Sequence, residues 1–402
     1  MAECSIGPQP RAQTRAARWF AVAGALLLAA CQTVVPRTAA PPPTPERVVE
    51  RPRPAEEPRT DADVVRDTER HRVALLVPLS GPNAGVGQSI ANATQLALLD
   101  TQSRDIRINN YDTAAGAAAA VQRAIADGAQ LILGPLLADD VRVVAPIARA
   151  ARVPVVSFSN DAGVAGNGAY LMGYVPAQSI GRVVEFTRSR GVTSFAGLVP
   201  NGLYGERAST AFLRAVEGAG GQVVSLQTYA RQSGAVAQAV SRLATRAPYG
   251  AVLIADGGAT AAAAAPLVKR GAGAATRLLG TELWNAEAGV ATRPQLNGAW
   301  FASVSDTLYR QYAAKYRGRF GAAPYRLSSL GYDAVLLTVR IARDWPIDAA
   351  FPEAKLRDPG GFAGLDGAFR FRDYVAERAL EVQEIRGGTT VVVSPAPTGF
   401  GR

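Results

Sequence analysis

The 402-residue sequence is poor in the side chains that carry most metal, redox and nucleophilic chemistry. It contains one histidine, His71, and two cysteines, Cys4 and Cys31. Because a zinc or haem site needs a cluster of such ligands, we expect no metal site and no cofactor. Catalysis of the Ser-His-Asp or Cys-His type is excluded for the same reason. A glycosidase-like pair of carboxylates stays open in principle, although no spacing singles one out, and we expect a protein that is not an enzyme.

The sequence also lacks any run of lysines and arginines interleaved with aromatic residues. Its 43 basic and 33 acidic residues give a formal net charge of +10, but this surplus is dispersed. We therefore expect no nucleic-acid partner. Hydrophobic residues make up 48% and charged residues 19% of the chain, which excludes a disordered protein. At about 100 to 200 residues per domain, this length predicts two lobes or two domains.

The most apolar stretch near the N-terminus, Trp19–Ala30, is too short to span a bilayer, which takes roughly 20 apolar residues. It follows the basic residues Arg11, Arg15 and Arg18 and ends in small residues. A basic region, a short apolar region and small residues before a cleavage point are typical of a secretory signal. The segment 1–31 is thus predicted to be an export signal.

The run Leu28-Ala29-Ala30-Cys31 resembles the lipobox of bacterial lipoproteins. The resemblance implies that Cys31 is acylated and holds the exported chain to a membrane. Gln32 stands where some bacterial lipoproteins carry an aspartate for inner-membrane retention, which favours the outer membrane. An ordinary signal peptide with an incidental cysteine is the alternative.

Residues 32–70 form a segment rich in proline, arginine and glutamate, including Pro41-Pro42-Pro43. Few of its residues could be buried, so we expect a disordered tether. Proline-rich chain favours an extended form of about 3.1 Å per residue, which would hold the folded part away from a membrane surface.

From residue 71 onward, apolar runs of strand length alternate with segments of helical periodicity. Parallel sheets covered by helices on both faces are built from such units. Nine strands exceed what one compact sheet usually needs, so the sequence predicts an α/β protein of two doubly wound parallel-sheet lobes with a central cleft. The expected strands are 73–79, 106–111, 131–133, 153–158, 195–199, 223–228, 251–255, 278–280 and 300–304. The expected helices are 88–99, 115–127, 141–149, 179–190, 207–219, 236–245 and 259–270.

Several short motifs in the second part of the chain resemble one known fold, and their order and spacing carry the resemblance. They are Val77-Pro78-Leu79-Ser80-Gly81-Pro82, Leu133-Gly134-Pro135-Leu136, Val153-Pro154-Val155-Val156-Ser157, Tyr204-Gly205-Glu206, Gly280-Thr281-Glu282 and Gly331-Tyr332-Asp333-Ala334. The fold is that of the type 1 periplasmic binding proteins. This group includes the Leu/Ile/Val-binding proteins and the penicillin-binding protein activator lipoproteins, which the chain resembles most.

The resemblance implies a chain that passes between the lobes three times, near Gly173–Pro176, Ser305 and Pro359–Leu365. Lobe 1 would comprise about 71–174 and 305–358, and lobe 2 about 176–304 and 360–402. The segments 364–371 and 379–385 alternate in the manner of an antiparallel strand pair that closes the fold.

The same resemblance implies a set of cleft residues. In the amino-acid binders a carboxylate and a tyrosine face the ligand, and Glu282 and Tyr204 stand at those places here. Three other positions differ from the binders, namely Val86, Ala138 and Asp161. An aspartate at position 161 would repel a ligand carboxylate unless a cation intervenes. The candidate cleft residues are Ser80, Ser157, Ser159, Asp161, Tyr204 and Glu282.

Two functions are compatible with these observations. The first is a non-enzymatic envelope lipoprotein of the activator type, which would bind a peptidoglycan synthase, that is, a penicillin-binding protein. The second is a substrate-binding lipoprotein that delivers an amino acid, an amide or another small polar ligand to an ABC permease. The lipid-anchored, periplasm-facing location is common to both, and the altered cleft positions favour the first.

Overall fold

The computed structural model describes residues 69–287, 289–397 and 399–400. The predicted signal peptide, Cys31 and the tether up to residue 68 lie outside the described residues. The described residues belong to one compact unit that contains two lobes, each built on its own sheet. None of the described helices is both long and apolar enough to cross a membrane.

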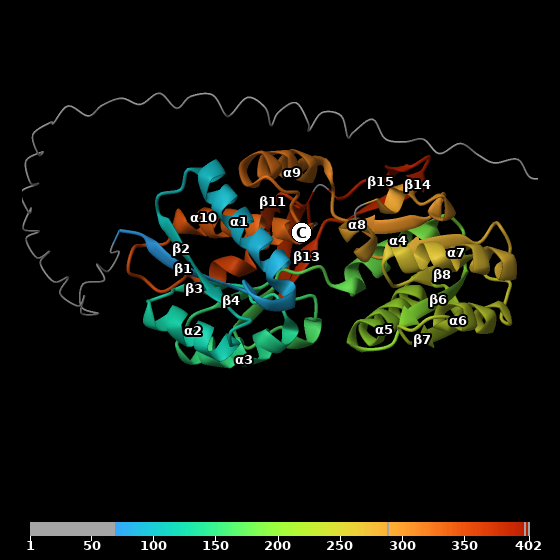
Figure 1. The fold of residues 1–402 in the computed structure, drawn as a ribbon, viewed down its shortest axis with the longest axis horizontal. Helices are drawn as coiled ribbons and strands as arrows, with labels where there is room; N and C mark the ends of the chain where they lie inside the picture. The colour runs from blue at the N-terminus through green and yellow to red at the C-terminus, as the bar shows by residue number, and fades with distance from the viewer. Residues whose placement is uncertain (1–68, 288, 398, 401–402) are drawn as a thin grey trace, which may run out of the picture. The chain divides into compact units, whose positions relative to one another are not determined.

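Lobe 1 is built on an eight-stranded sheet with the order β11-β12-β13-β5-β4-β3-β1-β2 (Figure 1). Its strands from β2 to β5 are parallel, and β11, β12 and β13 form an antiparallel ribbon at one edge. The strands are β1 (His71–Val77), β2 (Ile106–Asp112), β3 (Leu131–Leu133), β4 (Val155–Ser157), β5 (Ala169–Leu171), β11 (Phe362–Gly364), β12 (Gly367–Arg372) and β13 (Val375–Arg378).

Lobe 2 is built on a seven-stranded sheet with the order β15-β14-β10-β9-β8-β6-β7. Its strands from β7 to β10 are parallel, and β14 and β15 add an antiparallel hairpin. The strands are β6 (Ser194–Pro200), β7 (Gln222–Tyr229), β8 (Ala251–Ile254), β9 (Arg277–Gly280), β10 (Trp300–Ser303), β14 (Glu381–Arg386) and β15 (Thr389–Ser394).

Helices cover both faces of each sheet. In lobe 1 they are α1 (Ala84–Thr101), α2 (Ala117–Ala126), α3 (Ala138–Ala150), α9 (Thr307–Phe320) and α10 (Ser328–Ala342). In lobe 2 they are α4 (Pro176–Ser189), α5 (Leu203–Gly218), α6 (Ala235–Ala244), α7 (Gly258–Ala272) and the short α8 (Leu283–Ala286). Single 3-10 turns occur at η3 (Gly81–Asn83), η4 (Ala162–Val164), η5 (Val290–Thr292), η6 (Pro294–Leu296) and η7 (Glu353–Arg357).

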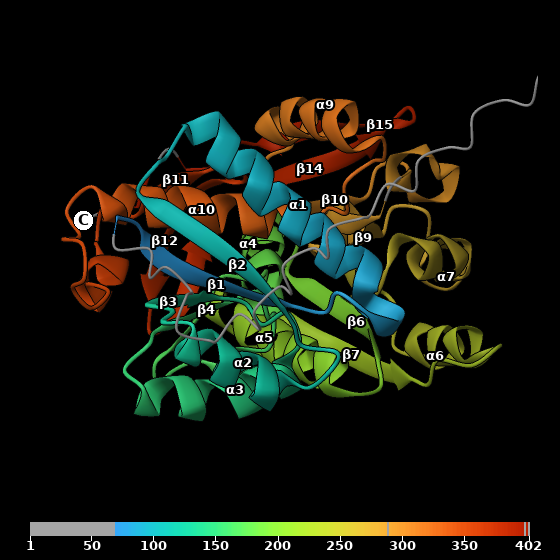
Figure 2. The same ribbon diagram turned by 60° about the vertical axis from the view of Figure 1, so that its left-hand side comes forward.

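Strand β1 shows why these apolar runs form sheets covered on two sides. Leu75 and Val77 pack into a core with residues of α1 and α10, whereas Ala74 and Leu76 pack with residues of α2 and α3. Successive side chains of a strand point to opposite faces, so a continuous apolar run needs a helical layer on each side. Figure 2 shows α1 on one side of β1 and β2, and α2 and α3 on the other. The predicted α/β fold of two doubly wound lobes is confirmed.

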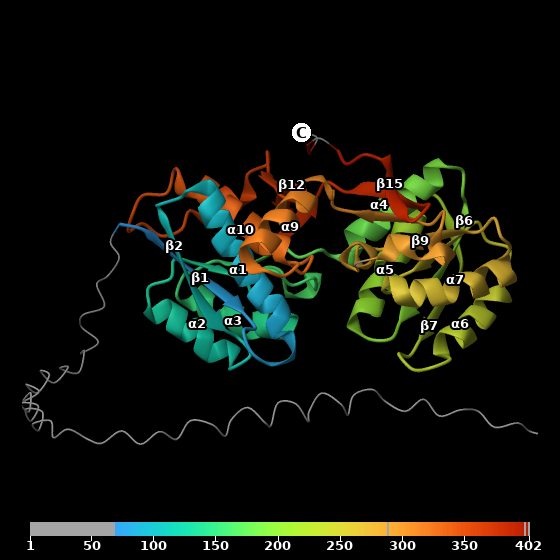
Figure 3. The same ribbon diagram turned by 45° about the horizontal axis from the view of Figure 1, so that its top comes forward.

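Lobe 2 repeats this arrangement. Phe195 and Val199 of β6 pack against α4 and α5, and Ala196 and Leu198 pack against α6 and α7. Figure 3 shows α6 and α7 side by side in this lobe. The loops at the carboxyl ends of the parallel strands carry the polar residues discussed below.

The third connection between the lobes differs from the prediction. We expect it near Pro359–Leu365, but the chain stays in lobe 1 through β13 and crosses at Ala379–Leu380. The reason is that Val375 of β13 pairs with Leu171 of β5, which adds the whole ribbon to the first sheet. The predicted boundary at residue 360 is therefore wrong.

The predicted strand pair at the end of the chain is also wrong. The segments 364–371 and 379–385 correspond to β12 and β14, which lie in different sheets. The short strand β13 follows β12 after a tight turn at Asp373 and Tyr374, both with positive φ, and takes the place beside β12. Strand β14 pairs with β10 and β15 instead.

Candidate functional site

The site begins with a partly buried carboxylate, that of Glu282, in the turn between β9 and α8. One of its oxygens accepts a hydrogen bond from the Tyr204 hydroxyl at 3.0 Å. The other accepts a hydrogen bond from the Ser179 hydroxyl of α4. Tyr204 lies in the first turn of α5 and also contacts the Thr281 hydroxyl at 3.0 Å. The structure thus joins Tyr204 and Glu282, the two residues that match the amino-acid binders.

Burial raises the pKa of Glu282, although the hydrogen bonds from Ser179 and Tyr204 oppose the shift. Burial also raises the pKa of Tyr204, and the nearby Glu282 charge adds to this rise. Among the described residues, no arginine or lysine forms an ion pair with Glu282. A partly buried carboxylate without a cation favours a positively charged ligand group such as an ammonium.

A small cavity borders this cluster where the three connections between the lobes meet. Its volume is about 20 Å³, which suits one or two water molecules and is too small for an amino acid. The polar side chains around the cavity include Ser179, Glu282, Asn285, Ser303, Arg326 and Arg378.

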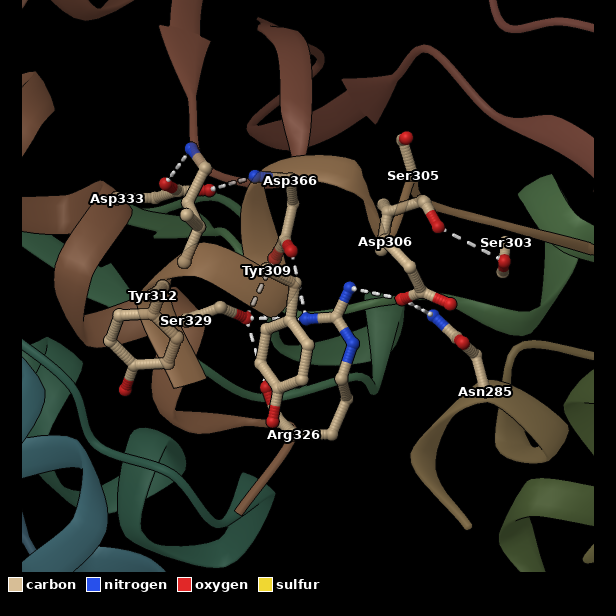
Figure 4. A network of polar contacts seen from close by, with 12 residues as sticks. Asn285, Ser303, Ser305, Asp306, Tyr309, Tyr312, Arg326, Ser329, Asp333 and Asp366 are labelled. Carbon is tan, nitrogen blue, oxygen red and sulfur yellow. Dashed lines mark hydrogen bonds and ion pairs between the residues drawn. The ribbon is translucent and has the colours of Figure 1, made fainter. Parts of the chain in front are cut away.

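Arg326 is the centre of a buried polar network in lobe 1 (Figure 4). Its guanidinium donates to Asp366 at 2.8 Å and to Ser329 at 2.9 Å, and it lies 4.0 Å from the centre of the Tyr309 ring. Asp366 also accepts a hydrogen bond from Tyr174. The charges of Arg326 and Arg378, with hydrogen bonds from Tyr174 and Ser329, hold the pKa of Asp366 low despite its burial.

This network ties the three connections between the lobes together. Tyr174 belongs to the first connection, and Asp306 of the second lies 3.7 Å from Arg326. Asp306 also accepts a hydrogen bond from Asn285 of lobe 2 at 3.3 Å, as Figure 4 shows. Arg378, at the end of β13, donates to the Met172 carbonyl at 2.7 Å. We call this arrangement the hinge network, because it lies where the chain crosses between the lobes, beside the Glu282 cluster.

Asp161 is not an unpaired charge but forms two ion pairs. One of its oxygens lies 2.9 Å from Arg142 of α3, and the other lies 3.2 Å from Arg207 of α5. The side chain is only 5% exposed, and it also accepts a hydrogen bond from the Gly163 amide at 2.9 Å. The expected repulsion of a ligand carboxylate therefore loses its basis, because two cations intervene.

The three candidate serines, Ser80, Ser157 and Ser159, form hydrogen bonds within the loops of lobe 1. Ser157 donates to the Pro135 carbonyl at 2.9 Å and accepts from the Ser159 amide at 3.0 Å. Ser159 accepts from the Asp161 amide at 3.2 Å. Ser80 is exposed, and its hydrogen bond helps to lower the pKa of Asp112. Among the described residues, no hydrogen bond joins these serines to Tyr204 or Glu282.

Trp284 fixes the turn that carries Glu282. The side chain is fully buried, and its indole N–H donates to the Asp256 carbonyl at 3.0 Å. Its ring lies directly over Gly280, where an added Cβ would come within 2.2 Å of the indole. This tryptophan is thus packed, not presented to a ligand.

Sequence reasoning missed Ser179, Arg207, Arg326, Asp366 and Arg378. One signal existed for Arg207, which follows Tyr204 by three residues and so shares a face of the same helix. The other four lie far from Glu282 in the chain and come near it only through the fold.

Comparison with known proteins gives one family and many similar structures. The periplasmic binding protein family matches residues 71–389. A solved structure from Rhodospirillum rubrum, described as a branched-chain amino acid ABC transporter, aligns with a TM-score of 0.72 and 20% identity over 81% of this chain and 100% of that one. The isoleucine complex of the substrate-binding protein LivJ from Streptococcus pneumoniae aligns with a TM-score of 0.61 and 16% identity over 81% of this chain and 100% of that one.

An uncharacterized protein of Rickettsia prowazekii is 24% identical over 146 residues. The match spans 36% of this chain and 39% of that protein.

Proposed function

We propose, because the chain belongs to the periplasmic binding protein family, that it is an exported solute-binding protein whose lobes close on a small polar ligand that carries an amine. The observation that supports this most is the Glu282 carboxylate, which is partly buried, bound by two hydroxyls and unpaired with any cation among the described residues. An ammonium group would complete its coordination and offset the cost of its burial.

The hinge network supports the same proposal. Arg326, Asp366 and Arg378 hold the three connections together, which leaves the lobes free to move as units about this point. Such a movement would admit a ligand to the Glu282 cluster. The solute would then pass to an ABC permease, in keeping with the described role of the similar structures from R. rubrum and S. pneumoniae.

The activator hypothesis loses its main structural argument. It drew on an altered pocket in which Asp161 repels a carboxylate, and Asp161 is neutralised by Arg142 and Arg207. Binding to a peptidoglycan synthase, the lipid anchor on Cys31 and the outer-membrane location remain predictions.

A thermal-shift screen with the common amino acids and their amides tests the proposal. A ligand at 100 times its Kd should raise the free energy of unfolding by about 2.7 kcal/mol. We expect at least one amine-bearing compound to stabilise the protein, and we expect Glu282→Gln to abolish the shift. Glu217→Gln is the matched control, because Glu217 is an exposed residue on α5. Absence of any shift across the panel would contradict the proposal.

A further inference from the structure

A second cavity lies between helices α4 and α5, and Asn160 and Ala162 of lobe 1 also line it. We call it the α4–α5 groove. Its volume is about 700 Å³, within the range of roughly 300–1,000 Å³ that is usual for small-molecule sites. Val175 is the one residue that it shares with the small cavity beside the Glu282 cluster. Apolar residues of both helices line it, among them Pro176, Ala177, Gly181, Ala211 and Ala215.

Gly181 leaves the groove open in the middle of α4. A Cβ added at this position would meet no atom within 4 Å, so packing does not require glycine here. The backbone does not require it either, because Gly181 is not among the residues with positive φ. Glycine inside a helix costs about 1 kcal/mol relative to alanine. A larger side chain at position 181 would extend into the groove.

The charged residues of the groove favour an anion. They are Glu206, Arg207 and Arg214, which gives two cations to one carboxylate. Arg207 already binds a carboxylate, that of Asp161 in lobe 1, at 3.2 Å. The Arg207 side chain is 48% exposed and so can be reached from solvent.

Gly163 provides the room in which Arg207 meets this carboxylate. A Cβ on Gly163 would come within 2.2 Å of the Arg207 guanidinium. If another acid replaced Asp161 on Arg207, Asp161 would keep its contact with Arg142 at 2.9 Å. The exchange would therefore leave no buried charge unpaired.

We propose that the α4–α5 groove is a second binding site, for a small carboxylic acid with an apolar body. The apolar part lies between α4 and α5 against Ala177, Gly181 and Ala211, and the carboxylate takes the place of Asp161 on Arg207. Because Asp161 belongs to lobe 1 and Arg207 to lobe 2, binding of the acid releases a contact between the lobes.

Isothermal titration of the full chain with benzoate tests this site, with benzyl alcohol as the neutral probe of similar shape. We expect benzoate to bind more tightly than benzyl alcohol. Arg207→Gln should weaken benzoate binding by about tenfold, since a charge-assisted hydrogen bond is lost. Arg246→Gln, at an exposed arginine just after the end of α6, should leave it unchanged. Asp161→Asn should tighten benzoate binding, because the competing carboxylate is removed.

Gly181→Leu should abolish benzoate binding while the protein stays folded, since leucine is a better helix former and meets open space. Gly318→Leu is the matched control, because Gly318 also sits in a helix with nothing near its Cβ. The proposal is overturned if wild-type protein shows no benzoate binding at about 10 mM, or if Gly181→Leu binds as wild type does. Loss of benzoate binding in Glu282→Gln, with binding retained in Gly181→Leu, would place the acid at the Glu282 cluster and also overturn it.

Discussion

Arg207 of lobe 2 binds the carboxylate of Asp161 in lobe 1, with 3.2 Å between the Arg207 Nε atom and Asp161 Oδ1. Arg142 binds the other oxygen of the same carboxylate from within lobe 1. This pairing determines whether Asp161 opposes an acidic ligand group in the cleft. A carboxylate that two cations neutralise does not oppose the binding of an acidic group, whereas a lone aspartate at the same position would.

The contact between Asp161 and Arg207 should contribute little to stability. Arg207 is half exposed, and ion pairs of this kind contribute about 1 kcal/mol or less. A double-mutant cycle with Asp161→Asn and Arg207→Gln, measured by urea unfolding, should give a coupling free energy in this range. The coupling should shrink as salt is added. A coupling of several kcal/mol that resists salt would show that this pair holds the lobes together by itself.

Arg326→Met should lower the free energy of unfolding far more than loss of the contact between Asp161 and Arg207. Asp366 is fully buried, and removal of its closest cation would leave only the more distant Arg378 to offset its charge. Breaking a buried pair in this way costs roughly 3–5 kcal/mol. Arg340→Met provides the control, because that arginine is 59% exposed and its partner Asp358 lies 3.7 Å away. Equal effects of the two substitutions on the free energy of unfolding would contradict the central place that we give to Arg326.

Gly280→Ala tests how the turn that carries Glu282 is fixed. The new methyl group would meet the Trp284 ring, which is itself fully buried. Overpacking of this kind costs roughly 1–3 kcal/mol, and the displaced turn should weaken ligand binding as well. Gly318→Ala, in open space on α9, should be neutral or slightly stabilising. Wild-type stability and affinity in Gly280→Ala would show that the packing of Trp284 does not position Glu282.

Much of the fold could be predicted from the sequence because the strands are apolar on both faces. A run such as Val73–Val77 can be buried only between two helical layers, and the alternation with helical segments then indicates parallel sheets. The ribbon of β11 to β13 could not be predicted in the same way. Strand β13 has the sequence Val-Ala-Glu-Arg, which is short and half polar, and its place depends on the pairing of Val375 with Leu171.

The residues of the site likewise fall into two groups, those that could be predicted from the sequence and those that could not. Glu282 and Tyr204 could be identified because they lie in short motifs whose neighbours in the chain set their place. Arg326 and Asp366 are 40 residues apart, and Ser179 and Glu282 are 103 apart, so their contacts exist only in the folded chain. Whether Asp161 was paired could not be known from its own loop, because one of its two partners comes from the other lobe.

The raised pKa of Glu282 predicts a pH dependence of stability. Its pKa in the folded protein lies above the ordinary value of 4.5, so the folded state binds more protons than the unfolded state between these two values. The contribution of Glu282 to stability is therefore fully present below pH 4.5 and is lost as the pH rises through the folded pKa. Thermal unfolding of Glu282→Gln should show a smaller decline over this interval than wild type. An identical pH dependence of the two proteins would contradict a partly buried carboxylate without a cation partner at this position.

The most direct test of the account is calorimetric titration of wild type, Glu282→Gln and Glu217→Gln with the amino acid or amide that stabilises the protein most in the thermal-shift screen. We predict that wild type and Glu217→Gln bind it with the same Kd. Glu282→Gln should bind it at least about 100-fold more weakly, since a charge-assisted contact with the ammonium is lost. Equal affinity of all three proteins would contradict the claim that Glu282 is the residue that receives the ligand.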